Sequence, residues 1–210
     1  MFNLIKKSAF TMAEILLVIG IIGVVASLTL PNLNNNADER VNVSKAKKVY
    51  SDLSAAVDRM AIKHSGSPDT WGAANTVGKM NSSMKIKGTG TSYWSSAGDC
   101  ANVATGLADG SSYCAVANST TCMNILFDID GPKKGMNTVG YDIFKASILI
   151  PTVGTNPLEL RAWSCSDAGS FTTSTKPGAE NYLNWLVQYD NMDYRTCPNN
   201  LFYQNVVTCK

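Results

Sequence analysis

The sequence predicts an α+β fold in which a long N-terminal helix packs on a small antiparallel β-sheet. Three observations lead to this prediction. An uncharged apolar run covers residues 15–30, an amphipathic pattern covers residues 38–63, and β-rich runs joined by turn residues follow residue 110. All six cysteines lie beyond the helix, so we also expect loops stapled by disulfides in an oxidising compartment.

The first half of the long helix is predicted from its apolar run. None of residues 15–30 is charged, and a helix of about sixteen residues is about 24 Å long. Adding residues 10–13 brings it close to the ~30 Å hydrocarbon core of a bilayer. We therefore expect residues 10–31 to form a transmembrane helix, with Lys6 and Lys7 keeping the N-terminus in the cytoplasm.

One carboxylate, Glu14, lies at the start of this apolar run. A charge within a membrane-spanning helix costs on the order of 2.5–3.5 kcal/mol at the bilayer centre and less toward the interface. A protein that needed only an anchor would not keep it. We therefore expect Glu14 to meet a cation.

Residues 6–14 read Lys-Lys-Ser-Ala-Phe-Thr-Met-Ala-Glu, and the apolar run that follows ends at Pro31. This segment resembles the N-terminal cleavage and methylation segment of type IV pilins and of the pseudopilins of type II secretion systems. The resemblance implies that residues 1–9 are a leader peptide. It also implies that a prepilin peptidase cuts between Ala9 and Phe10 and N-methylates Phe10.

The resemblance assigns assembly roles to the helix. It implies that Glu14 pairs with the α-amine of Phe10 in a neighbouring subunit, an amine that is largely protonated at neutral pH. Burying the two charges together is tolerable, whereas burying either alone is costly. A pairing within one helix is an alternative, because the two residues are four positions apart. Gly20, Gly23 and Pro31 would give the helix flexibility during assembly, or Pro31 would simply mark the end of the apolar segment.

Two other classes of N-terminal segment compete with this interpretation. They are a secretory signal peptide and a plain signal anchor. A signal peptide has an apolar region of ~7–15 residues that ends in a small-residue cleavage site, and Glu14 has no role in it.

Residues 32–65 are predicted to be the amphipathic second half of the helix. Apolar residues recur at three- and four-residue spacing at Ala46, Val49, Tyr50, Leu53, Ala56, Val57, Met60 and Ala61. End signals follow at residues 64–68, His-Ser-Gly-Ser-Pro. This face should pack on a globular β domain that covers residues 66–210.

Within that domain, β-rich runs at 111–118, 122–130 and 142–150 predict antiparallel strands. A further strand is expected within 158–165 and a short helix at about 179–190. The Asp-x-Asp-Gly turn at 128–131 and the residues up to 144 resemble a loop of many pseudopilins and minor pilins.

Four oxygen-bearing residues of this loop are candidate calcium ligands: Asp128, Asp130, Asn137 and Asp142. Calcium takes six to eight oxygen ligands, and alternating aspartates near a glycine turn can supply several. The alternative, which the residue types favour, is that these side chains form turns by accepting hydrogen bonds from their own backbone.

Six cysteines allow fifteen disulfide connectivities, and the sequence does not choose among them. The C-terminal segment looks like the disulfide loop of many pilins, which favours Cys197 with Cys209. Pairing Cys100 with Cys114 then leaves Cys122 and Cys165. Reduced, buried thiols are the alternative.

Enzymatic chemistry finds no support in the sequence. The chain has no Gly-x-Ser-x-Gly elbow, no phosphate-binding loop and a single histidine, His64. The absence of a Cys-x-x-Cys pair argues against structural zinc, and the net charge of +2 gives no case for nucleic acid.

We therefore expect a structural subunit of a type II secretion pseudopilus or a type IV pilus. It would be stored in the inner membrane as a single-pass protein and assembled into a fibre in the periplasm or at the cell surface. Its expected partners are identical or related pilin subunits, the prepilin peptidase, the inner-membrane assembly platform and membrane lipid. The alternative is a membrane-anchored extracytoplasmic binding protein or enzyme that does not polymerise.

Overall fold

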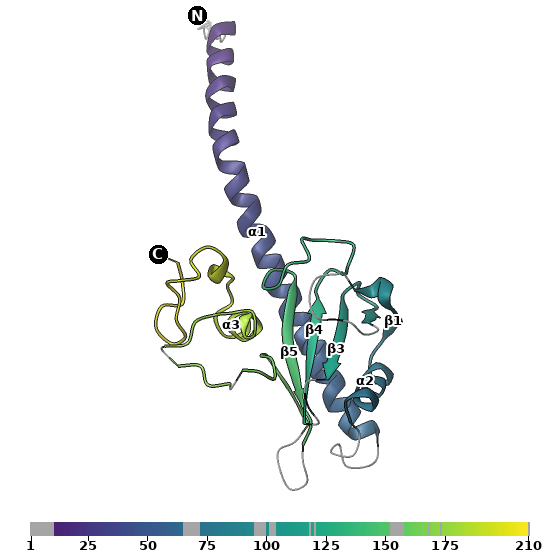
Figure 1. Cartoon of the computed structure of the whole chain (residues 1–210). Helices are drawn as coiled ribbons and strands as arrows, with labels where there is room; N and C mark the ends of the chain where they lie inside the picture. Colours follow the sequence, from purple (N-terminus) through teal and green to yellow (C-terminus); the bar gives the residue numbers. More distant parts are fainter. Residues whose placement is uncertain are drawn as a thin grey trace, which may run out of the picture. The chain divides into compact units, whose positions relative to one another are not determined.

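The structure is a computed structural model (Figure 1) that describes residues 11–64, 72–94, 100, 104–117, 119, 121–151, 158–167, 169–172 and 174–209. Within these ranges, the side chains of residues 28–36, 72–74 and 117 are not described. The chain divides into two compact units, residues 1–38 and residues 39–210.

The first unit contains the beginning of helix α1, which extends from Met12 to Lys63. Its described side chains up to position 27 are exposed, apart from the half-buried Ala26. Pro31 lies inside α1, so the helix does not end there. A Cβ atom added at Gly20 or Gly23 would meet nothing within 4 Å, and the assembly flexibility expected of these positions stays a prediction.

The prediction of a transmembrane helix at residues 10–31 is wrong by the criteria of length and apolarity. Among the residues that the structure describes, no helix is long and apolar enough to cross a bilayer. The uncharged run is only about 24 Å long as a helix, short of the ~30 Å that spanning requires. Phe10, which belongs to the predicted transmembrane span, lies outside the described residues.

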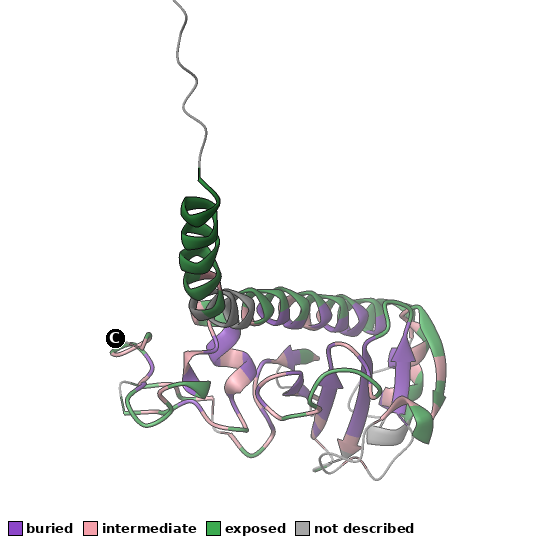
Figure 2. Cartoon of the chain, turned by 90° about the horizontal axis from the view of Figure 1, so that it is seen from above, coloured by how far each residue is buried: buried purple, intermediate pink, exposed green. Residues whose placement is uncertain are grey.

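In the second unit, the remainder of α1 packs on the domain through one face. Figure 2 shows the buried side of this helix turned toward the buried strands. The buried residues are Val43, Ala46, Val49, Leu53, Ala56, Val57 and Met60. Their three- and four-residue spacing confirms the predicted amphipathic pattern, although Tyr50 is only half-buried and Ala61 is exposed.

The β-sheet has six antiparallel strands in the order β1-β2-β3-β4-β5-β6. The strands are β1 Ile86–Gly90, β2 Ala104–Leu107, β3 Ser112–Ala117, β4 Cys122–Asp128, β5 Ile143–Leu149 and β6 Glu159–Arg161. Strands β3, β4 and β5 confirm the three predicted β-rich runs. One face of the sheet and α1 enclose a common apolar core that includes Leu53, Phe127 and Ile148.

The remaining elements cover the ends of the sheet. Helix α2, Gly72–Ser82, and the short 3-10 helix η2, Thr91–Tyr93, accompany β1 and β2. Helix α3, Tyr182–Tyr189, lies beside β5 (Figure 1) and confirms the short helix expected near residues 179–190. A second 3-10 helix, η3, covers Asp193–Arg195.

Aromatic side chains hold the C-terminal region together. Trp185 of α3 is fully buried, and its ring lies edge-to-face with that of Tyr203 at 4.9 Å between centroids. In η3, the Arg195 guanidinium lies 3.9 Å from the centre of the Tyr141 ring, and its Nη1 atom lies 3.6 Å from Oε1 of Glu39. This arginine therefore links the C-terminal region to α1 and to the loop before β5.

Three disulfides staple the domain: Cys100–Cys114, Cys122–Cys165 and Cys197–Cys209. Cys197–Cys209 is the pairing that the resemblance favoured, and the other two are the pairings that we expected beside it. The longest link ties the first residue of β4 to the segment after β6, and the shortest closes the C-terminal loop. All six cysteines are used, so the alternative of reduced thiols does not apply to this structure.

Candidate functional site

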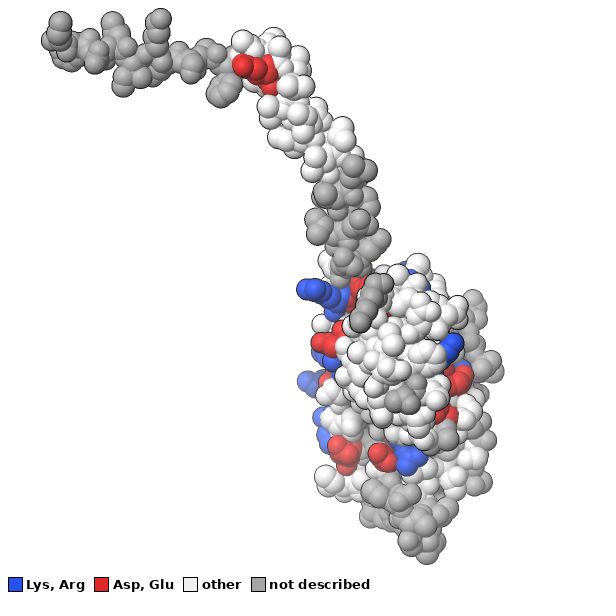
Figure 3. Space-filling model, turned by 90° about the vertical axis from the view of Figure 1, so that its left-hand side faces the viewer, with Lys and Arg blue, Asp and Glu red and all other residues white. Residues whose placement is uncertain are grey.

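The first candidate site is the exposed apolar surface at the start of α1. Large apolar side chains project from all sides of the helix, and Leu16 is 67% exposed. The exposed set comprises Met12, Ile15, Leu16, Leu17, Val18, Ile19, Ile21, Ile22, Val24 and Val25. On the face seen in Figure 3, this part of the helix carries no basic residue and one acidic patch near its beginning. The surface is therefore apolar over about four turns, with a single charge at one end.

That charge, Glu14, is held in a reciprocal capping arrangement with Thr11. The Thr11 amide and hydroxyl donate to Oε2 of Glu14 at 2.8 and 2.9 Å, and the Glu14 amide donates to Oγ1 of Thr11 at 3.3 Å. This is a capping box, in which residues three apart satisfy each other's free amides. The Thr-x-x-Glu spacing was visible in the sequence, but the sequence interpretation did not use it.

The capping box influences the ionisation of Glu14. Hydrogen bonds from the Thr11 amide and then from its hydroxyl lower the pKa of the Glu14 carboxyl below its usual value. The carboxylate is therefore charged at neutral pH and remains open to solvent. The cleavage position, Ala9–Phe10, lies outside the described residues, so the expected pairing with the Phe10 amine stays a prediction.

The second candidate site is the loop between β4 and β5, where the four candidate calcium ligands lie. Asp142 is 1% exposed, and its two carboxylate oxygens accept hydrogen bonds from the backbone amides of Met136, Asn137 and Thr138. The bonds to Met136 and Asn137 are both 2.7 Å long. Asp142 thus closes the loop upon itself, which is the turn-forming role.

Asp128 performs a similar task at the start of the loop. Its Oδ1 atom accepts hydrogen bonds from the amides of Asp130 and Gly131 at 3.1 and 2.8 Å. Gly131 has a φ of 86°, a left-handed conformation that glycine adopts without strain. The Asp-x-Asp-Gly sequence therefore forms a turn at the end of β4.

The calcium hypothesis is not supported by these contacts. The described part of the chain contains no group of three His, Cys, Asp or Glu residues placed to hold a metal ion. Both Asp142 oxygens and one Asp128 oxygen already accept backbone amides, which favours the turn alternative. Among the described atoms, Oδ2 of Asp128 and Oδ1 of Asp130 and of Asn137 are buried without a hydrogen-bond partner.

The protonation state of Asp128 bears on these unpartnered oxygens. Burial first, and the neighbouring Asp130 carboxyl as well, raise the pKa of Asp128 to about 7, against the lowering effect of the hydrogen bonds from the amides of Asp130 and Gly131. Protonated Asp128 is a donor as well as an acceptor. The proton on Asp128 removes one negative charge from the loop.

This pKa makes the stability of the domain depend on pH. The unfolded chain ionises Asp128 near pH 4, whereas the folded chain holds its proton up to about pH 7. The folded state therefore loses stability as pH rises from about 4 to about 7 and loses no more above that range. We expect the Tm of Asp128→Asn to lack this decline and to exceed the wild-type Tm above pH 7.

Thermal unfolding from pH 4 to pH 8 by circular dichroism tests this expectation. Asp58→Asn is the matched control, because Asp58 is exposed on α1. A wild-type decline that Asp128→Asn reproduces in full would assign the pH dependence to other groups.

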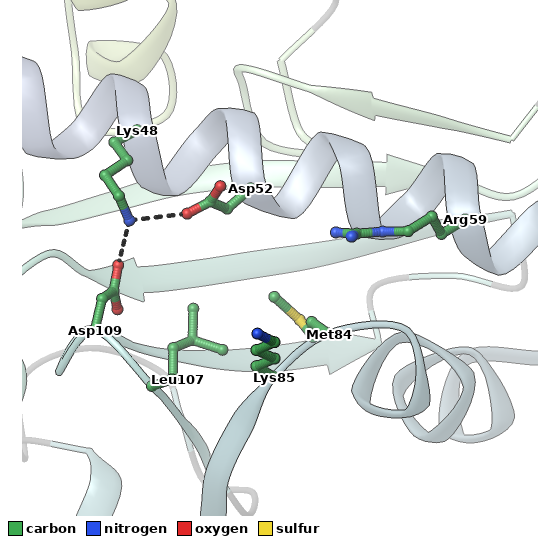
Figure 4. A pocket seen from close by; sticks show the side chains of 8 residues that line it. Lys48, Asp52, Arg59, Met84, Lys85, Leu107 and Asp109 are labelled. Carbon is green, nitrogen blue, oxygen red and sulfur yellow. Dashed lines mark hydrogen bonds and ion pairs between the residues drawn. The ribbon is translucent and has the colours of Figure 1, made fainter.

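A third candidate, shown in Figure 4, is a pocket of about 280 Å³ between α1 and the edge of the sheet. Lys48 of α1 donates to Asp52 at 3.0 Å and to Asp109, in the turn between β2 and β3, at 2.8 Å. These bonds, the one to Asp109 first, raise the pKa of the Lys48 ammonium. The Lys48–Asp109 ion pair joins α1 to the β2–β3 turn, so we assign this pocket a structural role.

No enzyme-like site emerges from the described residues. His64 lies at the end of α1, where its Nε2 atom is 2.8 Å from the hydroxyl of Ser82 in α2, so it joins two helix ends. Comparison of the chain with protein-family models, with curated proteins and with solved structures gave no match.

Proposed function

We propose that this chain is a structural subunit of a type IV pilus or a type II secretion pseudopilus and polymerises through its N-terminal helix. The observation that carries the proposal is the exposed apolar surface of α1 from Met12 to Val25. A helix that is apolar on all sides is normally buried among other apolar surfaces. The same helix of a second copy of the chain offers such a surface, and a repeated contact of this kind produces a fibre.

The position of Glu14 fits this proposal. It is the only charged residue among positions 11–37, and it stands four positions after Phe10. Cleavage before Phe10 would create an α-amine at the same end of the helix. When helices of several copies pack together, the amine of one copy and the carboxylate of another neutralise each other and fix the axial register between subunits.

The processing machinery follows from the same resemblance. We expect a prepilin peptidase to remove residues 1–9 and an assembly platform to add the processed subunit to the fibre. The three disulfides support assembly outside the cytoplasm, because disulfides persist in oxidising compartments.

The capping box favours one alternative. Because it gives Glu14 a local partner in Thr11, the carboxylate has a role in a chain that never polymerises. That chain would be an extracytoplasmic binding protein or an enzyme that does not polymerise.

Two variants separate the assembly role from the capping role. Glu14→Gln keeps a side chain that can complete the capping box but removes the charge, and Thr11→Val removes the cap hydroxyl but keeps the charge. We expect Glu14→Gln to be processed normally but to decrease in sheared fibres by at least about tenfold, since it leaves a buried amine unpaired. Thr11→Val should enter fibres at nearly the wild-type level.

The measurement is the amount of each variant in sheared fibres relative to the amount in the cells, by immunoblot. Normal incorporation of Glu14→Gln together with loss of Thr11→Val would show that the cap matters and the charge does not. Absence of the wild-type chain from the sheared fibres would favour the non-polymerising alternative.

A further inference from the structure

An open pocket of about 380 Å³ lies on the sheet beside the β4–β5 loop. Its walls come from β1, η2, the β2–β3 turn and the beginning of the β4–β5 loop. Three features of this pocket are unexplained by the fibre proposal. They are an aromatic platform, a group of lysines and a buried hydroxyl.

The aromatic platform is the ring of Tyr93, which lies over a pair of glycines. Gly88 of β1 and Gly106 of β2 are directly opposite each other in the register of the two strands. A Cβ atom at Gly106 would overlap the Tyr93 ring, and one at Gly88 would lie 2.8 Å from its hydroxyl oxygen. The two glycines therefore leave the space that the ring occupies, and Tyr93 remains half-exposed and lines the pocket.

The pocket is rich in positive charge. Lys87, Lys133 and Lys134 line it and are exposed, and none of the three forms an ion pair with a described residue. The carboxylate of Asp130 is the only acidic group in the described lining. An unpaired group of three lysines against one carboxylate attracts an anion.

The floor of the pocket holds a polar atom without a partner. Ser112, the first residue of β3, is 1% exposed and lines the pocket, and its Oγ atom has no hydrogen-bond partner among the described atoms. A buried hydroxyl in this state costs free energy unless something supplies a partner. The Oγ atom is covered by protein atoms, so this hydroxyl is not a contact for a ligand in the pocket.

We propose that this pocket binds an acidic saccharide, a sugar ring that carries a carboxylate or a phosphate. The face of the sugar ring packs on Tyr93, its hydroxyls donate hydrogen bonds to Asp130, and its anionic group lies among Lys87, Lys133 and Lys134. The pocket volume lies in the range of small-molecule sites. The near-neutral chain, with a net charge of +2, argues against an extended polyanion such as nucleic acid.

Saturation-transfer NMR on the full chain in detergent tests this proposal, with glucuronic acid, glucose 6-phosphate and glucose as probes. We expect signals from one or both acids and none from glucose, and the two acids show which anionic group the lysines accept. Tyr93→Ala should weaken binding by about tenfold, the effect of losing one aromatic contact.

The Lys133→Ala/Lys134→Ala double variant removes charge from an exposed loop, where folding is unaffected, and should also abolish the signal. Lys45→Ala, at an exposed position of α1, is the matched control and should bind like the wild type. Absence of binding by both acids, or equal binding by glucose, would overturn the proposal. So would tighter binding of a single-stranded oligonucleotide, or retention of full binding by the double lysine variant.

Discussion

Replacing Cys122 and Cys165 by alanine is expected to lower the free energy of unfolding by about 4 kcal/mol. The two residues are 43 positions apart, the longest loop that a disulfide closes in this structure. A link across a longer loop removes more conformational freedom from the unfolded chain. The link also joins the first residue of β4 to the segment after β6, so its loss frees the outer edge of the sheet.

Urea unfolding followed by tryptophan fluorescence measures this effect. The matched control is the Cys197→Ala/Cys209→Ala variant, whose loop spans 12 positions and whose expected loss is about 3 kcal/mol by the same relation. A larger loss in the control than in the Cys122/Cys165 variant would contradict the loop-entropy explanation and point to contacts in the C-terminal loop.

Asp142→Ala is expected to destabilise the domain by about 3 kcal/mol. The substitution leaves three backbone amides, those of Met136, Asn137 and Thr138, without their carboxylate acceptor. Each loss of a charged acceptor costs on the order of 1–3 kcal/mol, and access of water to the exposed parts of the loop reduces the sum. Asp142→Asn keeps one acceptor oxygen and should lose about half as much.

The free energy of unfolding in urea again provides the measurement, with Asp58→Ala as a surface control that should change it by less than about 0.5 kcal/mol. If Asp142→Ala were as stable as this control, the carboxylate would not be what closes the loop. A calcium-dependent difference between Asp142→Ala and the wild type would revive the metal hypothesis that the present contacts do not support.

The elements with a strong periodic pattern could be predicted from the sequence. The spacing from Ala46 to Met60 identified the buried face of α1, and the β-rich runs after residue 110 identified β3, β4 and β5. In these segments, the spacing of the residues that must be buried identifies the helix or the strand. The turn role of Asp128 and Asp142 was also available, because aspartates near glycine commonly accept hydrogen bonds from their own backbone.

The segment before β3 could not be predicted. Residues 66–110 are rich in glycine, serine, threonine and asparagine, so helix α2 and strands β1 and β2 leave no clear period in the sequence. The packing of the Tyr93 ring on Gly88 and Gly106 depends on the register of β1 and β2, which only the folded sheet defines. The transmembrane assignment failed because the uncharged run of residues 15–30 is short for a membrane span, and Phe10, which was added to it, lies outside the described residues.

The mass of the N-terminal peptide of the chain recovered from sheared fibres tests the central claim most directly. The fibre-subunit proposal predicts a peptide that begins at Phe10 and carries one methyl group on its α-amine. Recovery of the chain only outside the fibre fraction, with a peptide that begins at Met1, would contradict the proposal and leave the non-polymerising alternative.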